Sequence, residues 1–232
     1  MPEIRQSRVI LDDFQRADEN PLSHGGDWLQ VAPSNPTVWG LMELENTHAT
    51  HDDPLQFGFA YWNPLSLSGD DAECWAFALG GNASGTGWRV GLLRDVNGAS
   101  ASVDGYLFSF NISTGGGSTL LRRYTNGTAT DIDTNASSPS TGNPGYLLIR
   151  RNGNDVEGWA NTNAGDASSW TLYVSATDTS HTTDLHPAIG VSDNASQQTT
   201  YFDWFGGGAV SDWNQEFIRR PHNYMGRYVD RQ

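Results

Sequence analysis

Two glutamates, Glu43 and Glu45, have the spacing that best suits acid–base chemistry. Residues two apart in a β-strand share a face and lie about 6.5–7 Å apart along the strand. Glycosidases that retain configuration hold two carboxyl groups about 5–5.5 Å apart, and those that invert it hold them about 6.5–9.5 Å apart. The pair therefore fits glycoside hydrolysis. Two acids on the solvent face of a strand are more often merely hydrated, and we favour that interpretation.

A polar segment that follows these glutamates contains four side chains able to bind metal ions: His48, His51, Asp52 and Asp53. Zinc needs three or four converging ligands, and the spacing of two histidines does not establish convergence. Calcium takes six to eight oxygen ligands, which histidine does not supply. We favour a polar loop here and at the acidic turn Asp70-Asp71. We expect no cofactor, with calcium as the alternative.

The nine tryptophans divide into two groups by their place in the sequence. Five lie within apolar segments and are expected in the core: Trp75, Trp88, Trp159, Trp170 and Trp204. Four lie near loops or strand ends: Trp28, Trp39, Trp62 and Trp213. An exposed indole can stack on the apolar face of a sugar ring or anchor a protein interface. We name Trp28, Trp39 and Trp62 as candidate glycan-binding residues, with a protein interface and ordinary packing as alternatives.

The segments that would position these side chains favour strands nearly everywhere. Glycines (26) and prolines (10) separate short runs in which apolar residues recur at every second position. We expect the bulky members of these runs, such as Phe59, Trp75 and Phe77, to face a core. Turn pairs such as Asn126-Gly127 favour tight hairpins. Many short strands joined by turns predict an all-β chain, either a two-sheet sandwich or a barrel.

Charge and composition exclude several classes of function. The chain has 13 arginines, no lysine and 27 acids, for a net charge of −14. Such a chain is repelled by nucleic acid and by anionic lipid, so we expect neither as a partner. No apolar stretch is long enough to span a membrane, and charges near the start argue against a classical export signal. The single cysteine, Cys74, lies in an apolar segment where a buried, unreactive thiol is expected.

The last part of the chain differs from the rest. Residues 217–232 carry four arginines and one acid, whereas residues 1–208 carry nine arginines and 24 acids. Arginine and tyrosine are enriched at protein interfaces, so we favour a docking arm for a neighbouring subunit over an unstructured tail. The residues expected to dock are Trp213, Phe217, Arg219, Arg220, His222, Tyr224, Arg227, Tyr228 and Arg231.

The order of motifs resembles the concanavalin A-like lectin/glucanase sandwich in its laminin G-like form. The matching segments are 147–151, 170–174, 188–191 and 201–205, which include the strings LLIRR, WTLYV, AIGV and YFDWF. The opening DDFQRADENPL is similar to the first strand of such domains in bacteriophage virion proteins of high-GC hosts. The resemblance implies a two-sheet antiparallel jelly-roll sandwich over residues 1–208, followed by a C-terminal docking arm over residues 209–232.

This resemblance also bears on function. Glucanases of the superfamily carry three acids on one strand, whereas this chain has Glu45 in the place of their aspartate and His48 in the place of their general acid. We therefore expect no enzyme activity. The leading hypothesis is a virion structural protein, a minor tail or tail-tip protein on the virion exterior, that forms homo-oligomers, docks on other virion proteins and adheres to host-surface glycan. The alternatives are a capsid decoration or head-fibre protein and a glycan-degrading enzyme.

Overall fold

In a computed structural model of the chain, the described residues are 10–31, 39–51, 57–80, 87–95, 103–111, 117–138, 145–163, 169–192 and 200–210. Of the predicted docking arm, only residues 209–210 are described; all of its named residues lie outside these ranges, as do Asp52 and Asp53. The strands that contain Trp39 and His51 are described, but the side chains of these two residues are not. Among the described residues, no helix is long and apolar enough to cross a membrane.

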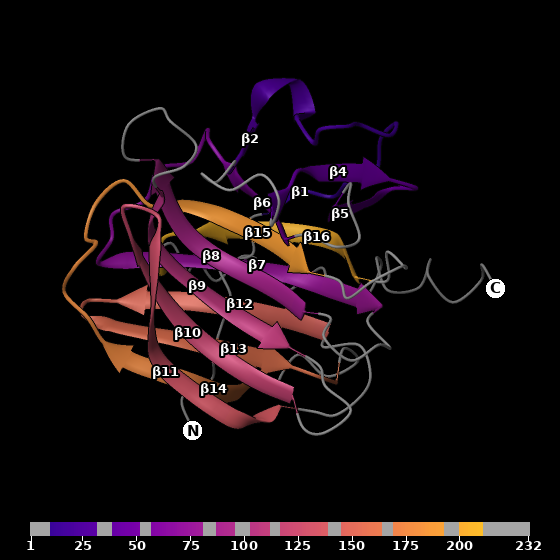
Figure 1. Cartoon of the computed structure of the whole chain (residues 1–232). Helices are drawn as coiled ribbons and strands as arrows, with labels where there is room; N and C mark the ends of the chain where they lie inside the picture. The colour runs from indigo at the N-terminus through magenta and orange to yellow at the C-terminus, as the bar shows by residue number, and fades with distance from the viewer. Residues whose placement is uncertain are drawn as a thin grey trace, which may run out of the picture.

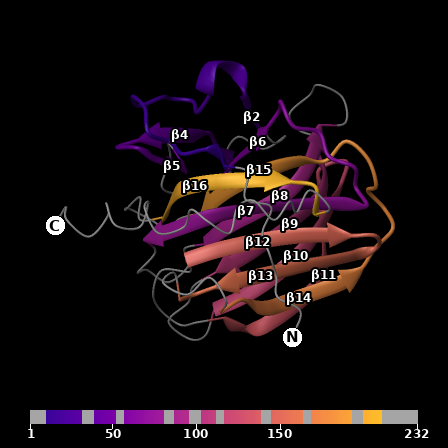
Figure 2. The same ribbon diagram turned by 180° about the vertical axis from the view of Figure 1, so that it is seen from behind.

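The described residues form two eight-stranded sheets that pack face to face (Figures 1 and 2). Sheet A has the order β14-β13-β12-β7-β16-β5-β4, with β1 also on β16; sheet B has the order β11-β10-β9-β8-β15-β6-β2, with β3 also on β6. Only the pairing of β3 with β6 is parallel among the named pairs. The strands are β1 (Ile10–Asp12), β2 (Trp28–Gln30), β3 (Trp39–Gly40), β4 (Met42–Glu45), β5 (His48–His51), β6 (Phe57–Trp62), β7 (Asp71–Gly80), β8 (Gly87–Asp95), β9 (Val103–Asn111), β10 (Gly117–Thr125), β11 (Thr128–Ser138), β12 (Gly145–Asn152), β13 (Asp155–Asn161), β14 (Thr171–Thr177), β15 (His186–Ser192) and β16 (Thr200–Gly208). The predicted two-sheet antiparallel sandwich is confirmed.

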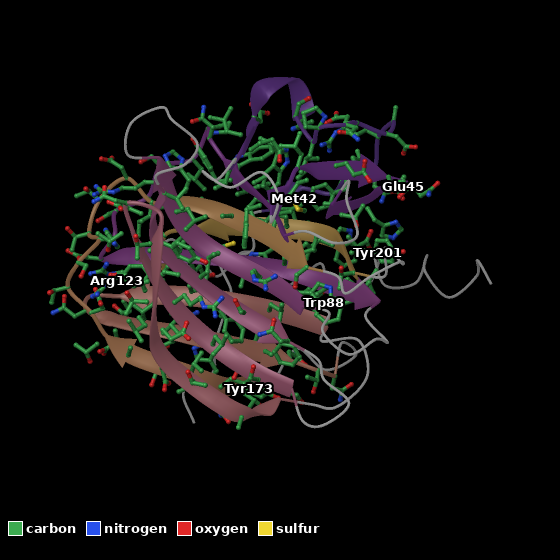
Figure 3. The ribbon with its side chains drawn as sticks, viewed as in Figure 1. Met42, Glu45, Trp88, Arg123, Tyr173 and Tyr201 are labelled. Carbon is green, nitrogen blue, oxygen red and sulfur yellow. The ribbon has the colours of Figure 1, made fainter. Side chains whose placement is uncertain are left out.

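The hydrophobic core fills the space between the sheets. Sheet B contributes its largest side chains, Trp88, Tyr106, Phe108 and Phe110, each at most 1% exposed. On β4, Met42 is buried while Glu45 projects from the end of the strand (Figure 3). This alternation follows the pattern expected for a strand with one buried face.

Strand β7 faces the core with its small residues, which corrects the expectation from its sequence. Ala72, Cys74, Ala76 and Ala78 belong to the core cluster. The Cys74 thiol lies 3.3 Å from the Ala188 carbonyl oxygen of β15. Because the backbone of the opposite sheet lies this close, there is no space for an indole here, and the bulky residues of β7 point outward. Burial raises the pKa of Cys74 to about 12, as expected for an unreactive thiol.

Two bulky residues of β6, Phe59 and Tyr61, also face away from the core. Ala60 belongs to the cluster between the sheets, whereas Phe59 and Tyr61 belong to a second buried cluster with Leu93 and Leu107. Successive residues of a strand point to opposite faces, so this second cluster lies on the outer face of sheet B. The sequence pattern of β6 therefore predicted a strand correctly but assigned its faces in reverse.

One end of the sandwich is held closed by a buried polar cluster around Arg151. This fully buried guanidinium donates to the Tyr106 hydroxyl (3.0 Å), to the Asp178 carbonyl oxygen (3.1 Å) and to the His181 carbonyl oxygen. The Tyr106 hydroxyl in turn donates to the Asp178 carboxylate (2.8 Å), which also binds Arg123 (2.7 Å). Burial lowers the pKa of His181, which favours its neutral ring. The cluster joins β9 and β10 of sheet B to β12 of sheet A.

Side chains of the edge strand β11 partly cover the backbone edge of β14. The Ser175 amide of β14 donates to the Asp133 carboxylate (2.8 Å), and the Asn135 side-chain amide donates to the Tyr173 carbonyl oxygen (3.0 Å). The Tyr173 ring, at the lower edge of Figure 3, packs against Phe110 at 5.5 Å. An exposed edge presents unpaired backbone groups to other chains. Here side chains from the opposite sheet form hydrogen bonds with some of the backbone groups at that edge.

Candidate ligand-binding surfaces

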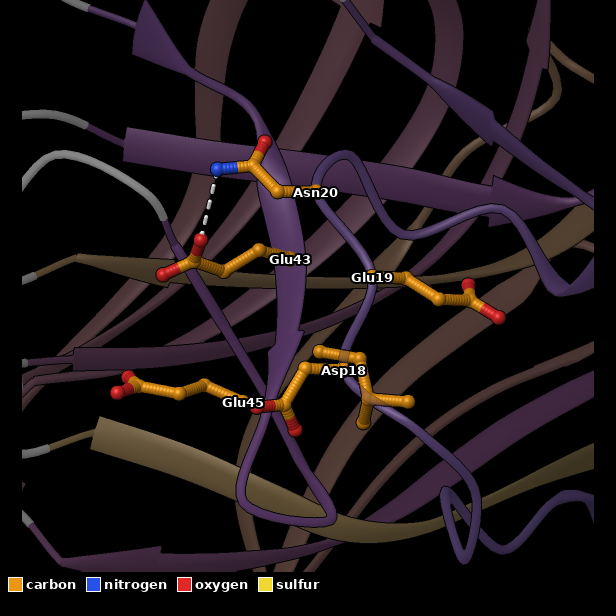
Figure 4. A pocket seen from close by; sticks show the side chains of 6 residues that line it. Asp18, Glu19, Asn20, Glu43 and Glu45 are labelled. Carbon is orange, nitrogen blue, oxygen red and sulfur yellow. Dashed lines mark hydrogen bonds between the residues drawn. The ribbon is translucent and has the colours of Figure 1, made fainter.

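The predicted carboxylate pair lies in a shallow acidic pocket lined by Asp18, Glu19, Asn20, Glu43, Leu44 and Glu45 (Figure 4). The segment 18–20 lies against β4 through two backbone hydrogen bonds between Glu19 and Leu44 (3.0 and 2.8 Å). Glu43 and Glu45 share the side of β4 opposite the buried Met42, as expected. The pocket therefore brings two further acids next to the predicted pair.

The acids of this pocket do not converge on a common point. Glu19 points away from Glu43 and Glu45 (Figure 4). Although burial opposes ionisation, hydrogen bonds from Arg16 and from two backbone amides lower the pKa of Glu19 to about 2. Glu43 accepts a hydrogen bond from the Asn20 side chain at 2.9 Å. Glu19 is thus a structural anion, unsuited to the general-acid role that glycoside hydrolysis requires.

The segment weighed as a candidate metal site shows local contacts at His48. Its Nδ1 lies 2.8 Å from the Asn46 carbonyl oxygen, and its Nε2 lies 3.9 Å from the Asp203 carboxylate. Within the described ranges, no three His, Cys, Asp or Glu side chains are grouped as metal ligands. The donor set around His48 does not fit calcium, which requires six to eight oxygens.

Two of the three tryptophans named as glycan-binding candidates are buried, which corrects that prediction. Trp28 is 2% exposed and Trp62 is 7% exposed. The Trp28 indole donates to the Asp12 carboxylate (2.7 Å), and its ring lies 5.3 Å from that of Trp62 and 4.7 Å from that of Phe205. Buried in this way, neither indole presents a face to a sugar. Position near a loop or strand end was a misleading guide to exposure, because such residues can still be covered by neighbouring strands.

A group of partly exposed aromatic residues lies instead on the outer face of sheet A. We call it the aromatic face and define it as Trp75, Phe77, Tyr146, Trp159, Trp170 and Trp204. Trp75 is 5% exposed, and the other five are intermediate in exposure. Trp159, Trp170 and Trp204 were expected in the core, so their positions are a correction. The outer face of an antiparallel sheet is ordinarily polar, which makes this face unusual.

Four of these rings form a continuous row. In the pairing of β16, β7 and β12, Trp204 lies opposite Phe77, and Phe77 lies opposite Tyr146. Ring centroids are 5.7 Å apart from Trp204 to Phe77, 4.8 Å from Phe77 to Tyr146, and 6.3 Å from Tyr146 to Trp170. Figure 2 shows these strands side by side on the face turned toward the viewer. The row therefore crosses the strands rather than following one of them.

A second row lies two residues further along the same strands. Leu148 of β12 is fully buried between Trp75 of β7 and Trp159 of β13, its partners in the register. Beyond it lies a polar border, where Arg150 donates to the buried Glu73 carboxylate (2.8 Å). The aromatic face thus changes from rings at one end to charged groups at the other.

One sequence signal could have revealed part of this face. From Cys74 to Leu79 both alternating sets of β7 are apolar, so one of them must face away from the core. In β16, the register with β7 shifts between Phe202 and Trp204, which allows both Phe202 and Phe205 to face the core and turns Trp204 outward. Such an irregularity reverses the alternation of faces within a strand, and it cannot be predicted from the residue types.

No family model and no curated protein matches this sequence. Several solved structures share its fold. Carbohydrate binding module CBM66 from Bacillus subtilis has a TM-score of 0.55 and 17% identity, over 79% of this chain and 96% of that one. The exoplasmic/lumenal domain of VIP36, in a Ca2+/Man-bound form, has a TM-score of 0.59 and 11% identity, over 82% of this chain and 87% of that one. A legume lectin-like domain from Entamoeba histolytica has a TM-score of 0.55 and 11% identity, over 82% of this chain and 94% of that one. The chain therefore has the concanavalin A-like lectin fold.

Proposed function

We propose that this protein is a non-catalytic carbohydrate-binding protein. The observation that carries the proposal is the aromatic face, because partly exposed Tyr and Trp rings present apolar area together with hydrogen-bond donors, the combination that suits sugars. The similar solved structures support it, since they include a carbohydrate binding module and the VIP36 exoplasmic/lumenal domain in a Ca2+/Man-bound form. Binding without catalysis agrees with the acidic pocket, where Glu19 points away from the predicted pair.

The test is retention of the full chain in native affinity gels that contain mannan, galactan or hydroxyethylcellulose. We expect slower migration in at least one gel, with or without EDTA, and no release of reducing sugar from the same polysaccharide. Full mobility in every gel would refute carbohydrate binding. Release of reducing sugar that Glu43→Gln abolishes would instead identify a glycan-degrading enzyme.

The wider role that we propose is adhesion on the exterior of a bacteriophage particle, as a minor tail or tail-tip protein. Its support is the opening segment DDFQRADENPL and the arginine- and tyrosine-rich sequence of residues 217–232. The sandwich would face outward, and the arm would bind other virion proteins. A capsid decoration protein of the same fold is the alternative, and imaging of labelled particles distinguishes the two.

Deletion of residues 217–232 tests this role. We expect the shortened chain to keep the circular dichroism spectrum and unfolding midpoint of the full chain, because every described strand ends by Gly208. We also expect the deletion to abolish incorporation into particles, measured by immunoblotting of purified virions. Particles that carry the shortened protein at normal occupancy would contradict a docking role for the arm.

A further inference from the structure

We infer that the aromatic face binds a soluble, neutral glycan chain that lies across strands β16, β7 and β12 and contacts several sugar units at once. This inference rests on the proposed function and adds where the ligand binds, its charge and its minimum length. The residues that carry it are the four rings of the row: Trp204, Phe77, Tyr146 and Trp170.

The length of the row indicates the length of the ligand. Neighbouring strands lie about 4.8 Å apart, and the row runs from β16 across β7 and β12 to the residue that precedes β14. The intervening strand β13 places Asn161, which is fully buried, opposite Tyr146, and the larger Trp170 ring approaches Tyr146 to 6.3 Å. One pyranose ring covers one or two such side chains. A ligand that contacts the whole row must therefore contain several linked sugars.

The orientation of the rings indicates the shape of the ligand. Successive rings are tilted by 34°, 50° and 45° along the row from Trp204 to Trp170. Tilted rings cannot all lie against one flat surface, such as that of a crystalline polysaccharide. They can each stack on a different sugar of a chain that twists along its length. The row therefore suits a soluble chain.

Charge favours a neutral glycan over other occupants of an apolar surface. Among the described residues of β7, β12 and β13 that share this face, the one basic side chain is Arg150, and it is paired with Glu73 (2.8 Å). Beside it, Glu157 accepts a hydrogen bond from the Trp159 indole (3.0 Å). The chain as a whole has a net charge of −14. An anionic glycan, or a second copy of this chain, would bring like charge to this surface, whereas a neutral glycan incurs no such repulsion.

The experiment compares Trp204→Ala, Tyr146→Ala and Trp170→Ala with the wild-type full chain, using calorimetry with neutral oligosaccharides of two to six units cut from the polysaccharide that retains the protein. Leu29→Ala is the matched control, because Leu29 is 38% exposed and lies on β2 of sheet B, in the other layer from the aromatic face. We expect wild-type affinity to rise with chain length. We expect Trp204→Ala and Tyr146→Ala to weaken hexasaccharide binding at least tenfold, and Trp170→Ala to remove the gain from the longest chains while leaving disaccharide binding unchanged.

Each other result has a distinct meaning. Conservative variants Trp204→Tyr and Tyr146→Phe should retain most binding, which separates loss of the ring from misfolding. If the wild type binds a glycan that the alanine variants bind equally well, the inference is wrong while the proposed function stands. Equal binding of polygalacturonate or of insoluble cellulose would refute the neutral, soluble ligand. A wild-type dimer that Trp204→Ala dissociates would identify the face as an interface between copies.

Discussion

Replacement of Arg151 by methionine is expected to destabilise the protein by about 3–5 kcal/mol, because it removes a buried charged group that other buried groups depend on. Methionine is close to arginine in length, so the fall in the free energy of unfolding comes mainly from lost hydrogen bonds and not from lost side-chain volume. The substitution removes the guanidinium donor from the carbonyl oxygens of Asp178 and His181. It also removes one of the two donors to the Tyr106 hydroxyl, which keeps its bond from the His181 amide. Each buried polar group left unsatisfied costs about 1–3 kcal/mol.

Urea unfolding followed by tryptophan fluorescence measures this effect. The control is Arg122→Met, which breaks an exposed pair with Asp131, whose side chain is 48% exposed. Exposed pairs contribute about 0–1 kcal/mol, so the control should unfold near the wild-type midpoint. Equal destabilisation by both substitutions would show that the buried cluster does not hold the sheets together. A destabilised Arg151→Met protein should also exchange the backbone amides of residues 178–181 faster than the core strands.

The second large effect is expected for Gly105→Ala on β9. Gly105 has φ of +125°, a region that only glycine enters readily. An added Cβ would lie 2.1 Å from the Leu92 carbonyl oxygen and 3.0 Å from the Leu93 Cα. Both atoms belong to the backbone of the paired strand β8, so no side chain can rotate to make room. We expect destabilisation of about 3 kcal/mol or more, from strain and steric conflict together.

Gly153→Ala separates the two causes. Gly153 also has positive φ, +61°, but an added Cβ would meet no atom within 4 Å. The cost there is therefore conformational only, about 1–2 kcal/mol. Thermal unfolding of the two variants should show a clearly larger fall in midpoint for Gly105→Ala. Similar midpoints for both proteins would mean that β8 and β9 can separate locally without loss of stability.

Several features of the protein followed from local sequence alone. Alternation of apolar residues predicted the strands, and the turn pair Asn126-Gly127 does join β10 to β11 in a hairpin. Met42 and Leu44 were correctly distinguished from Glu43 and Glu45, because only one of the two alternating sets is apolar. These features depend on neighbours in sequence, where backbone geometry and hydrophobicity act at short range.

The candidate site depended on contacts that sequence does not reveal. The side chain of Glu43 is held by Asn20, which is 23 residues away, and the faces of β7 and β16 were decided by the backbone of the opposite sheet and by a register shift. Strand periodicity specifies two faces, but it cannot tell which of two apolar faces lies against the other layer. That choice depends on the space between the sheets, which exists only once both have formed. The sequence by itself thus determined the strands and their class, whereas the tertiary structure decided which aromatic rings lie outside the core.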